Sequence, residues 1–175
     1  MSLDEIKSLK ALGSQSKITD ETVPTLAELA QMLPAQVALA SELKTDRFLE
    51  AEVCRRLGDE LACWGVLERT IVLSFSLARL QTLKRTLPDF PIGWISMSRL
   101  VPDEQVDMVG LFWPLIFINP FYVSRAHRRG MLVCPLDPAP EARIGLYMKM
   151  KCDALISDNP AKTKEAIKRW THKNS

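Results

Sequence analysis

The sequence predicts an α/β fold in which about six parallel strands alternate with outer helices, as one domain over residues 1–175. Three observations lead to this prediction. Short apolar runs alternate along the chain with amphipathic segments of helical period. The apolar runs are nearly continuous, which is typical of parallel strands buried on both faces. No linker, repeat or low-complexity segment divides the chain.

The expected helices are recognised by apolar spacing and by their start and stop residues. Residues 3–12 carry Leu or Ile at every third position, and Gly13 follows them. Thr25 and Glu28 form a capping-box pattern with Thr25 as the N-cap, and Pro88 and Gly130 stop two later helices. Residues 13–20 are polar and are expected to form a loop. The expected helices cover residues 3–12, 25–33, 46–61, 77–87, 103–109, 123–129, 141–151 and 161–170.

The expected strands are short apolar runs between these helices. They cover residues 37–44, 70–75, 91–95, 115–119, 131–136 and 153–157. Parallel sheets and barrels bind ligands at the carboxyl ends of their strands, so polar residues at those ends are candidates for function. Four strands end in such residues: Glu42 and Lys44, Ser74 and Ser76, Asn119, and Asp137.

Composition excludes several classes of function. The formal net charge of +2 gives no support for nucleic-acid binding. Four cysteines without a C-x-x-C pair, together with only two histidines, do not favour a zinc site. The cysteines are expected to be reduced, mostly buried thiols. The polar start and the short, proline-interrupted apolar stretch 109–123 predict neither a signal peptide nor a membrane span. We therefore expect a cytoplasmic protein.

The strand over residues 37–44 carries the most informative pattern. Because side chains alternate across a strand, Val37, Leu39, Ser41 and Leu43 share one face, and Ala38, Ala40, Glu42 and Lys44 share the other. The bulky face suits contact with outer helices, whereas the small face ends in two charges and suits a barrel interior that opens into a pocket. A carboxylate beside an ammonium group can bind a metal and a phosphate together. The alternative is a partly exposed ion pair without a function.

Seven segments also resemble one known family, in that family's order. They are Leu3–Leu9, Val23–Leu29, Ser41–Lys44, Ile71–Phe75, Pro91–Trp94, Arg125–Gly130 and Cys152–Pro160. They are similar to segments of the glycerophosphodiester phosphodiesterases, among them I-P-T-L-E-E, E-I-K, A-H-x-x-G and V-D-G-I-I-T-D-R-P. Together these matches extend over essentially the whole chain.

The resemblance implies a TIM-type (β/α)8 barrel that lacks strands 1 and 2. It implies a metal-dependent hydrolase of lipid metabolism that cuts glycerophosphodiesters into glycerol phosphate and an alcohol. By the resemblance, Glu42 matches a ligand of the family's divalent metal (Mg²⁺ or Ca²⁺), and Lys44 matches the catalytic lysine beside it. Ser74, Asn119 and Asp137 are the candidate substrate-binding residues.

The same resemblance shows what the sequence lacks. The family's H-R-G, E-x-D and H-D motifs do not occur, and His127 and His172 are expected on the surface. The family's W-T-V-N strand end reads Cys134 to Asp137 here. We therefore expect an inactive isolated chain with weak or absent metal binding. The alternatives are a noncatalytic binding or assembly protein, or a subunit completed by another chain. The two open barrel edges, at residues 37–44 and 153–157, are expected to favour self-association.

Overall fold

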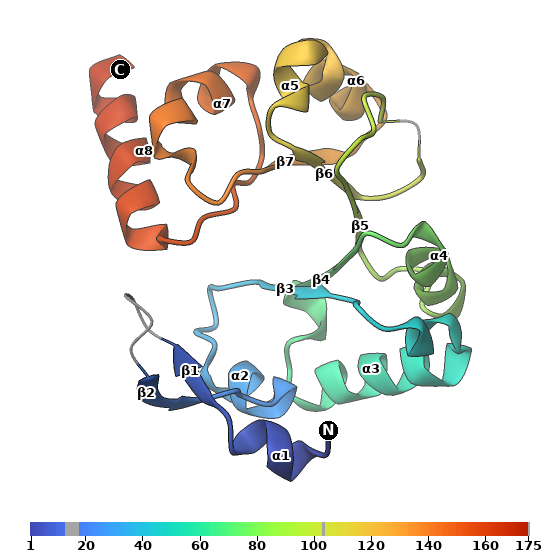
Figure 1. The fold of residues 1–175 in the computed structure, drawn as a ribbon. Coiled ribbons are helices and arrows are strands. Elements are labelled where there is room, and N and C mark those ends of the chain that lie inside the picture. Colours follow the sequence, from blue (N-terminus) through green and yellow to red (C-terminus); the bar gives the residue numbers. More distant parts are fainter. Residues whose placement is uncertain (13–17, 103, 175) are drawn as a thin grey trace. The chain divides into compact units, whose positions relative to one another are not determined.

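The parallel sheet is the central feature of the fold. The computed structural model describes residues 1–12, 18–102 and 104–174. In these residues, five strands form one sheet in the order β3 (Leu39–Glu42), β4 (Thr70–Ser74), β5 (Ile92–Ser96), β6 (Met108–Phe112) and β7 (Leu132–Leu136) (Figure 1). The pairs β4–β5, β5–β6 and β6–β7 are parallel. The predicted α/β class with a parallel sheet is confirmed.

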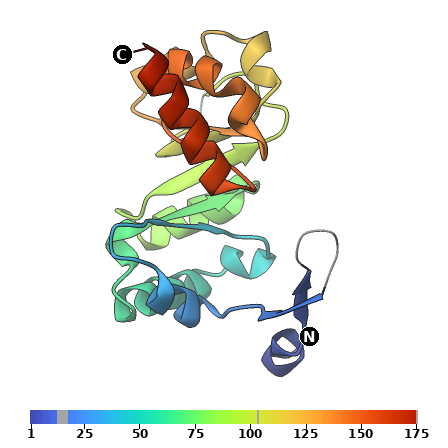
Figure 2. The same cartoon turned by 90° about the vertical axis from the view of Figure 1, so that its left-hand side faces the viewer.

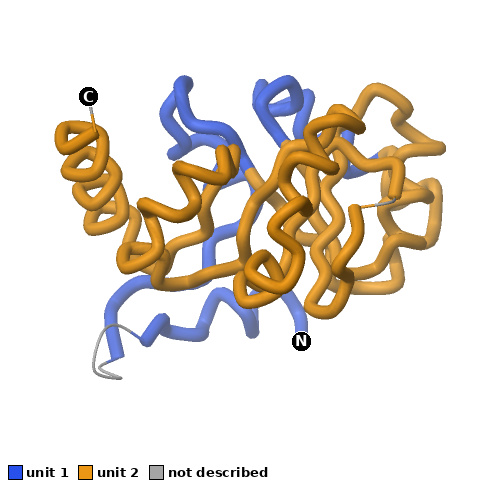
Figure 3. The backbone as a smooth tube through the Cα atoms, turned by 90° about the horizontal axis from the view of Figure 1, so that it is seen from above, with its two compact units in different colours: residues 1–39, 56–70 blue, residues 40–55, 71–175 orange. Residues whose placement is uncertain are grey.

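The chain divides into two compact units (Figure 3). Unit 1 comprises residues 1–39 and 56–70, and unit 2 comprises residues 40–55 and 71–175. The single domain over residues 1–175 stays a prediction. None of the helices in the described ranges combines the length and the apolar character that a membrane crossing requires.

Unit 1 begins with α1 (Leu3–Lys7), an antiparallel hairpin of β1 (Lys10–Leu12) and β2 (Ile18–Thr22), and α2 (Leu26–Met32). It also holds the second part of α3 (Ala51–Cys63) and the 3₁₀ helix η3 (Leu67–Arg69). The capping box of Thr25 and Glu28 is confirmed. The predicted helix over residues 3–12 is wrong beyond Lys7, because β1 pairs with β2 there. Part of the expected loop, residues 18–20, is strand, and residues 13–17 lie outside the described residues.

Unit 2 holds most of the sheet and the remaining helices. These are η2 (Asp46–Leu49), α4 (Leu77–Thr86), α5 (Leu115–Ile118), α6 (Tyr122–Arg128), η4 (Pro140–Arg143), α7 (Ile144–Met150) and α8 (Pro160–Asn174). Figure 2 shows α8, in red, as a continuous helix that contacts α7. The predicted helices over residues 46–61 and 141–151 each begin as a 3₁₀ turn and continue as an α-helix.

The two faces of the sheet differ in burial. Register places Ser74, Trp94, Val109 and Val133 in one row, and Val72 with Ile92 on the same face. The aliphatic residues of this face are 0–1% exposed. On the other face, Leu73 crosses Gly93 so closely that a Cβ there would lie 2.4 Å from the Leu73 Cδ2 atom. A larger residue at position 93 would fit only if the Leu73 side chain moved.

The predicted strand over residues 115–119 is wrong. These residues form α5 and its C-cap. The strand of this region is β6, which begins seven residues before the predicted one. The apolar stretch 109–123 contains both a strand and a helix, and apolar character alone does not separate them. Pro114, the N-cap of α5, lacks the N–H that a continuing strand would need. The helix expected over residues 103–109 is also wrong for residues 104–109, while residue 103 lies outside the described residues.

The predicted strand over residues 153–157 is wrong as well. Its first residues do lie beside β7, since the backbone N–H groups of Asp153 and Ala154 donate to the Val133 carbonyl at 2.9 and 3.3 Å. However, the Val133 N–H donates to the Asp153 side chain at 2.8 Å instead of to a backbone carbonyl. A side chain thus replaces the next ladder bond. The edge strands of the described sheet are β3 and β7.

Candidate functional site

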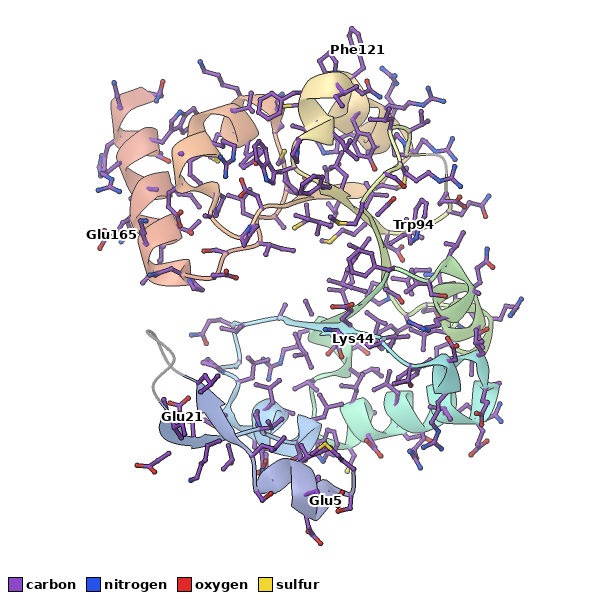
Figure 4. The ribbon with its side chains drawn as sticks, viewed as in Figure 1. Glu5, Glu21, Lys44, Trp94, Phe121 and Glu165 are labelled. Atoms are coloured by element: carbon purple, nitrogen blue, oxygen red, sulfur yellow. The ribbon has the colours of Figure 1, made fainter. Side chains whose placement is uncertain are left out.

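Glu42 and Lys44 form an exposed pair at the carboxyl end of β3. The Lys44 Nζ atom lies 3.5 Å from the Glu42 Oε2 atom, and the side chains are 74% and 32% exposed, respectively. Leu43 between them is buried, so the strand alternation expected from the sequence is present. Lys44 is labelled in Figure 4. The pair offers an ammonium group and a carboxylate to a ligand without first breaking a buried contact.

The backbone under this pair is fixed by two side chains. The Leu43 carbonyl accepts hydrogen bonds from the Ser74 hydroxyl at 2.9 Å and from the Arg79 Nη1 atom at 3.0 Å. The Leu43 N–H donates to the Leu73 carbonyl at 2.8 Å. Arg79 also binds the Asp46 carboxylate at 2.7 and 3.1 Å through two nitrogens. The turn that carries Glu42 and Lys44 is therefore held at both ends.

Ser74 and Arg79 thus both hold the Leu43 carbonyl. Ser74 is fully buried, and its hydroxyl oxygen also accepts the Ser76 N–H at 3.1 Å. Sequence reasoning identified Ser74 as a candidate for substrate binding but missed Arg79. No local pattern marks Arg79, because its partners Leu43 and Asp46 lie more than 30 residues away in the sequence.

Asn119 lies at the C-cap of α5 rather than at a strand end. Its Nδ2 atom donates to the Leu100 carbonyl at 2.7 Å, and its Oδ1 atom accepts the Phe121 N–H at 3.1 Å. The amide thereby joins the loop after β5 to the start of α6.

Asp137 follows β7 and lies in a buried network. Its Oδ2 atom accepts hydrogen bonds from the Arg143 Nε atom and the Tyr147 hydroxyl, both at 2.6 Å. Its Oδ1 atom accepts the Arg143 Nη2 atom at 2.8 Å and the Ala139 N–H at 3.3 Å. Burial raises the pKa of Asp137, but the hydrogen bonds from Arg143 and Tyr147 outweigh burial and hold the pKa below its ordinary value. Both carboxylate oxygens are engaged.

Arg143 also stacks on an aromatic side chain. Its guanidinium carbon lies 4.1 Å from the Trp113 ring centre, and Trp113 in turn meets Phe117 edge to face at 5.9 Å. Asp137 raises the pKa of Arg143, so the guanidinium stays charged. Sequence reasoning missed Arg143, Tyr147 and Trp113. Their roles depend on contacts between the loops after β6 and β7.

His127 lies near the other end of β7. Its Nε2 atom is 2.8 Å from the Asp153 Oδ2 atom, which also accepts the N–H of Val133, the second residue of β7. The pair therefore lies toward the amino end of β7. His127 is exposed, and its imidazole does not join the residues at the carboxyl ends.

The described residues alone do not fit a divalent cation. Mg²⁺ and Ca²⁺ need several oxygen ligands, and Glu42 supplies one carboxylate next to a cationic ammonium group. Across residues 1–12, 18–102 and 104–174, no three His, Cys, Asp or Glu side chains gather closely enough to hold a metal ion.

The fold and the site together define a class: a partial TIM-type barrel with a charged pair at the carboxyl end of a strand. The chain belongs to the glycerophosphoryl diester phosphodiesterase family, whose model matches residues 1–162. The resemblance seen in the sequence is confirmed. No curated protein matches the chain.

Solved structures confirm the fold. A glycerophosphodiester phosphodiesterase from Parabacteroides distasonis superposes with a TM-score of 0.81 at 17% identity, over 99% of this chain and 72% of that one. The enzyme of that name from Agrobacterium tumefaciens gives 0.73 at 18% identity, over 93% and 71%. An Oleispira antarctica phosphodiesterase in complex with the product sn-glycerol-3-phosphate gives 0.71 at 21% identity, over 95% and 70%. The chain thus spans about 70% of the length of these three structures.

Proposed function

We propose that this chain contributes Glu42 and Lys44 to a phosphoric diester hydrolase site that converts a glycerophosphodiester into glycerol phosphate and an alcohol. The observation that carries the proposal is the exposed Glu42–Lys44 pair at the carboxyl end of a parallel strand, in a chain of this family. In such sheets the carboxyl ends are where ligands bind.

The chemistry assigns a role to each charge. Attack of water on a phosphodiester builds negative charge on the phosphoryl oxygens, and an ammonium group such as that of Lys44 offsets it. The Glu42 carboxylate, 3.5 Å away, holds the ammonium in place and is an oxygen donor of the type that hard cations prefer. Ser74 and Arg79 act through the Leu43 carbonyl, by fixing the turn between the two charged residues.

For Asn119 and Asp137 we propose indirect roles. The hydrogen-bonding atoms of each side chain already bind the protein itself. Asn119 would set the position of the loop after β5, and Asp137 would set the position of Arg143. Neither offers a free polar atom comparable to the Lys44 ammonium.

Hydrolysis also needs a proton donor for the leaving alkoxide, a task that imidazole performs well near neutral pH. His127 lies toward the amino end of β7 and is paired with Asp153. We therefore expect residues 1–175 alone to be inactive, and we expect activity only when the family's histidine-bearing H-R-G and H-D segments are supplied.

A complementation assay tests this proposal. The purified chain is assayed with glycerophosphocholine and Mg²⁺ or Ca²⁺, alone and with a polypeptide that carries the missing family segments. Activity is expected only in the mixture, and Lys44→Ala should lower it at least about 100-fold, as is common when a charge at the reacting group is lost. Lys162→Ala, on exposed α8, is the matched control. Turnover by the chain alone, or a mixture insensitive to Lys44→Ala, would contradict the proposal.

One observation favours association with a second copy of the chain. Leu73, Met108 and Leu132 share one register row, and Phe75 and Met97 directly follow the ends of β4 and β5. Phe75, Met97 and Leu132 are 46–51% exposed. If a second copy covers this face, sedimentation at micromolar concentration will show a dimer. A monodisperse monomer would contradict self-association.

A further inference from the structure

A second exposed apolar surface lies outside the sheet. Phe117 and Ile118 of α5 and Phe121 at the start of α6 are 53%, 65% and 72% exposed, and Leu100 of the preceding loop is 37% exposed. The Asn119 side chain binds the Leu100 carbonyl and the Phe121 N–H, which joins the two loops. We call Leu100, Phe117, Ile118 and Phe121 the loop patch. Large apolar side chains that are exposed near one another mark interaction sites.

The loop patch rests on a rigid base. Phe117 meets Trp113 edge to face at 5.9 Å, and Trp113 carries the Arg143 guanidinium that Asp137 holds. Ile116, which precedes Phe117 in α5, is 1% exposed and anchors this helix in the core. The exposed side chains are therefore presented by a fixed scaffold. Figure 4 shows Phe121 projecting outward from the ribbon next to α5 and α6.

The segment that carries Phe117, Ile118 and Phe121 is basic, while the acidic residues nearest to α6 are Asp153, paired with His127, and Glu104 and Asp107, in a hollow with Arg129. Residues 108–136 contain no Asp or Glu and three arginines, Arg125, Arg128 and Arg129. Arg125 lies one helical turn after Phe121, since its N–H donates to the Phe121 carbonyl at 2.9 Å, and Arg128 follows on the same face. Both side chains are exposed and make no ion pair within the described ranges. The opposite face of α6, with Tyr122, Val123 and Ala126, is buried.

We propose that the loop patch docks the protein on a lipid surface that carries anionic headgroups. Apolar and aromatic side chains beside arginines are the pattern of segments that lie in the membrane interface. The aromatic rings enter the boundary between headgroups and acyl chains, and the guanidinium groups of Arg125 and Arg128 meet the lipid phosphates. A second copy of this chain is a poorer occupant, because its matching face would bring the same arginines together without acidic partners.

This inference does not rest on the proposed hydrolysis, because binding is measured without substrate. The full 175-residue chain is sedimented with vesicles of phosphatidylcholine, with and without phosphatidylserine. Binding should be clear with phosphatidylserine, weaker without it, and reduced by salt.

Three variants assign the binding to the loop patch. The double variant Ile118→Ser with Phe121→Ser should weaken partitioning at least about 30-fold, because two large apolar side chains no longer insert. Arg125→Gln with Arg128→Gln should weaken binding to anionic vesicles roughly 10- to 30-fold and remove the preference for phosphatidylserine. Met32→Ser, at a residue that is 79% exposed in unit 1, is the control and should change nothing.

A gain-of-signal variant keeps the test independent of folding defects. Phe121→Trp should retain binding, and the emission that it adds to that of the chain's four tryptophans, taken as the difference from the unaltered chain, should shift to the blue when anionic vesicles are added. Absence of binding by the unaltered chain at low salt, or equal binding by the Ile118→Ser, Phe121→Ser variant, would overturn the proposal. If the unaltered chain forms a dimer without lipid and the double variant is monomeric, the loop patch is a dimer interface, and the lipid proposal would be overturned too.

Discussion

The carboxyl ends of β3 and β7 both place an acidic residue beside a basic one, yet the two pairs differ in almost every physical property. Glu42 and Lys44 are 3.5 Å apart, and their side chains are 32% and 74% exposed. Asp137 and Arg143 are 2.6 Å apart at 2% and 26% exposed. The first pair makes one long contact, whereas the second is bidentate and is joined by the Tyr147 hydroxyl.

This difference suggests two uses: the buried Asp137–Arg143 pair stabilises the fold, and the exposed Glu42–Lys44 pair is available to a ligand. Buried charges that hydrogen-bond to each other fix the loop that carries them. Removing one of them leaves the other charge buried without a partner. An exposed pair contributes little to stability. Because Ser74 and Arg79 fix the backbone beneath this exposed pair, we propose that Glu42 and Lys44 serve in ligand binding rather than in stability. The four predictions below test this separation, from the largest expected effect to the smallest.

Asp137→Ala should destabilise the protein by about 3 kcal/mol, because it leaves the Arg143 guanidinium and the buried Tyr147 hydroxyl without their acceptor. Arg143 is partly exposed, which keeps the effect at the lower end of the range for buried pairs. Equilibrium unfolding in urea measures the change. Asp89→Ala, at an exposed carboxylate, is the control and should stay within about 0.5 kcal/mol. A loss below about 1 kcal/mol for Asp137→Ala would show that the network is not structural.

Tyr147→Phe should cost about 1.5–3 kcal/mol at neutral pH, as for a hydrogen bond to a charged group. Because the pKa of Asp137 is lowered in the folded protein, the stability that this carboxylate provides is present above its ordinary value of 3.8 and is lost as pH falls through the folded pKa. The cost of Tyr147→Phe should therefore shrink below pH 3.8. Urea unfolding at a series of pH values checks the trend, and a cost that grows on acidification would reverse our assignment.

Ser74→Ala should destabilise the protein by about 1–2 kcal/mol, since the Leu43 carbonyl and the Ser76 N–H each lose a partner. The Arg79 guanidinium still binds the Leu43 carbonyl, which limits the loss. Ser98→Ala, at an exposed hydroxyl, serves as the comparison. In the complementation assay, Ser74→Ala should lower activity less than Lys44→Ala does. An equal loss of activity from the two variants would mean that Ser74 contacts the substrate directly.

The contrast between the two strand ends also shows what the sequence can reveal. The Glu42–Lys44 pair was predictable because Lys44 follows Glu42, the last residue of β3, by two positions, and the alternation of the strand continues far enough to bring the two side chains together. Asp137 was identified as a polar strand end, but its partners Arg143 and Tyr147 follow at six and ten residues, across a 3₁₀ turn and a helix. Neither the helical nor the strand periodicity of the sequence predicts such a contact.

The fold was predictable to a similar degree. Strands β3, β4, β5 and β7 and the Thr25 capping box agree with the sequence pattern. The errors cluster where a different interaction decides. In residues 109–123 a proline separates a strand from a helix inside one apolar stretch. At Asp153 the side chain, rather than a backbone carbonyl, accepts the Val133 N–H, so residues 153–157 do not form a strand.

Glu42→Ala and Lys44→Ala should each change the free energy of unfolding by less than about 0.5 kcal/mol, because an exposed pair at 3.5 Å is screened by water and its loss uncovers no buried group. Glu68→Ala, at an exposed carboxylate, is the matched control.

Calorimetric titration of the isolated chain with Mg²⁺ or Ca²⁺ should show weak binding at most, since one carboxylate beside an ammonium group supplies too few oxygen ligands. Two results would contradict the separation of structure from function. A loss above about 1 kcal/mol for either variant would make the pair part of the scaffold. A tight metal site abolished by Glu42→Ala would mean that further ligands gather around Glu42, and the end of β3 would then be a complete metal centre rather than a contribution to one.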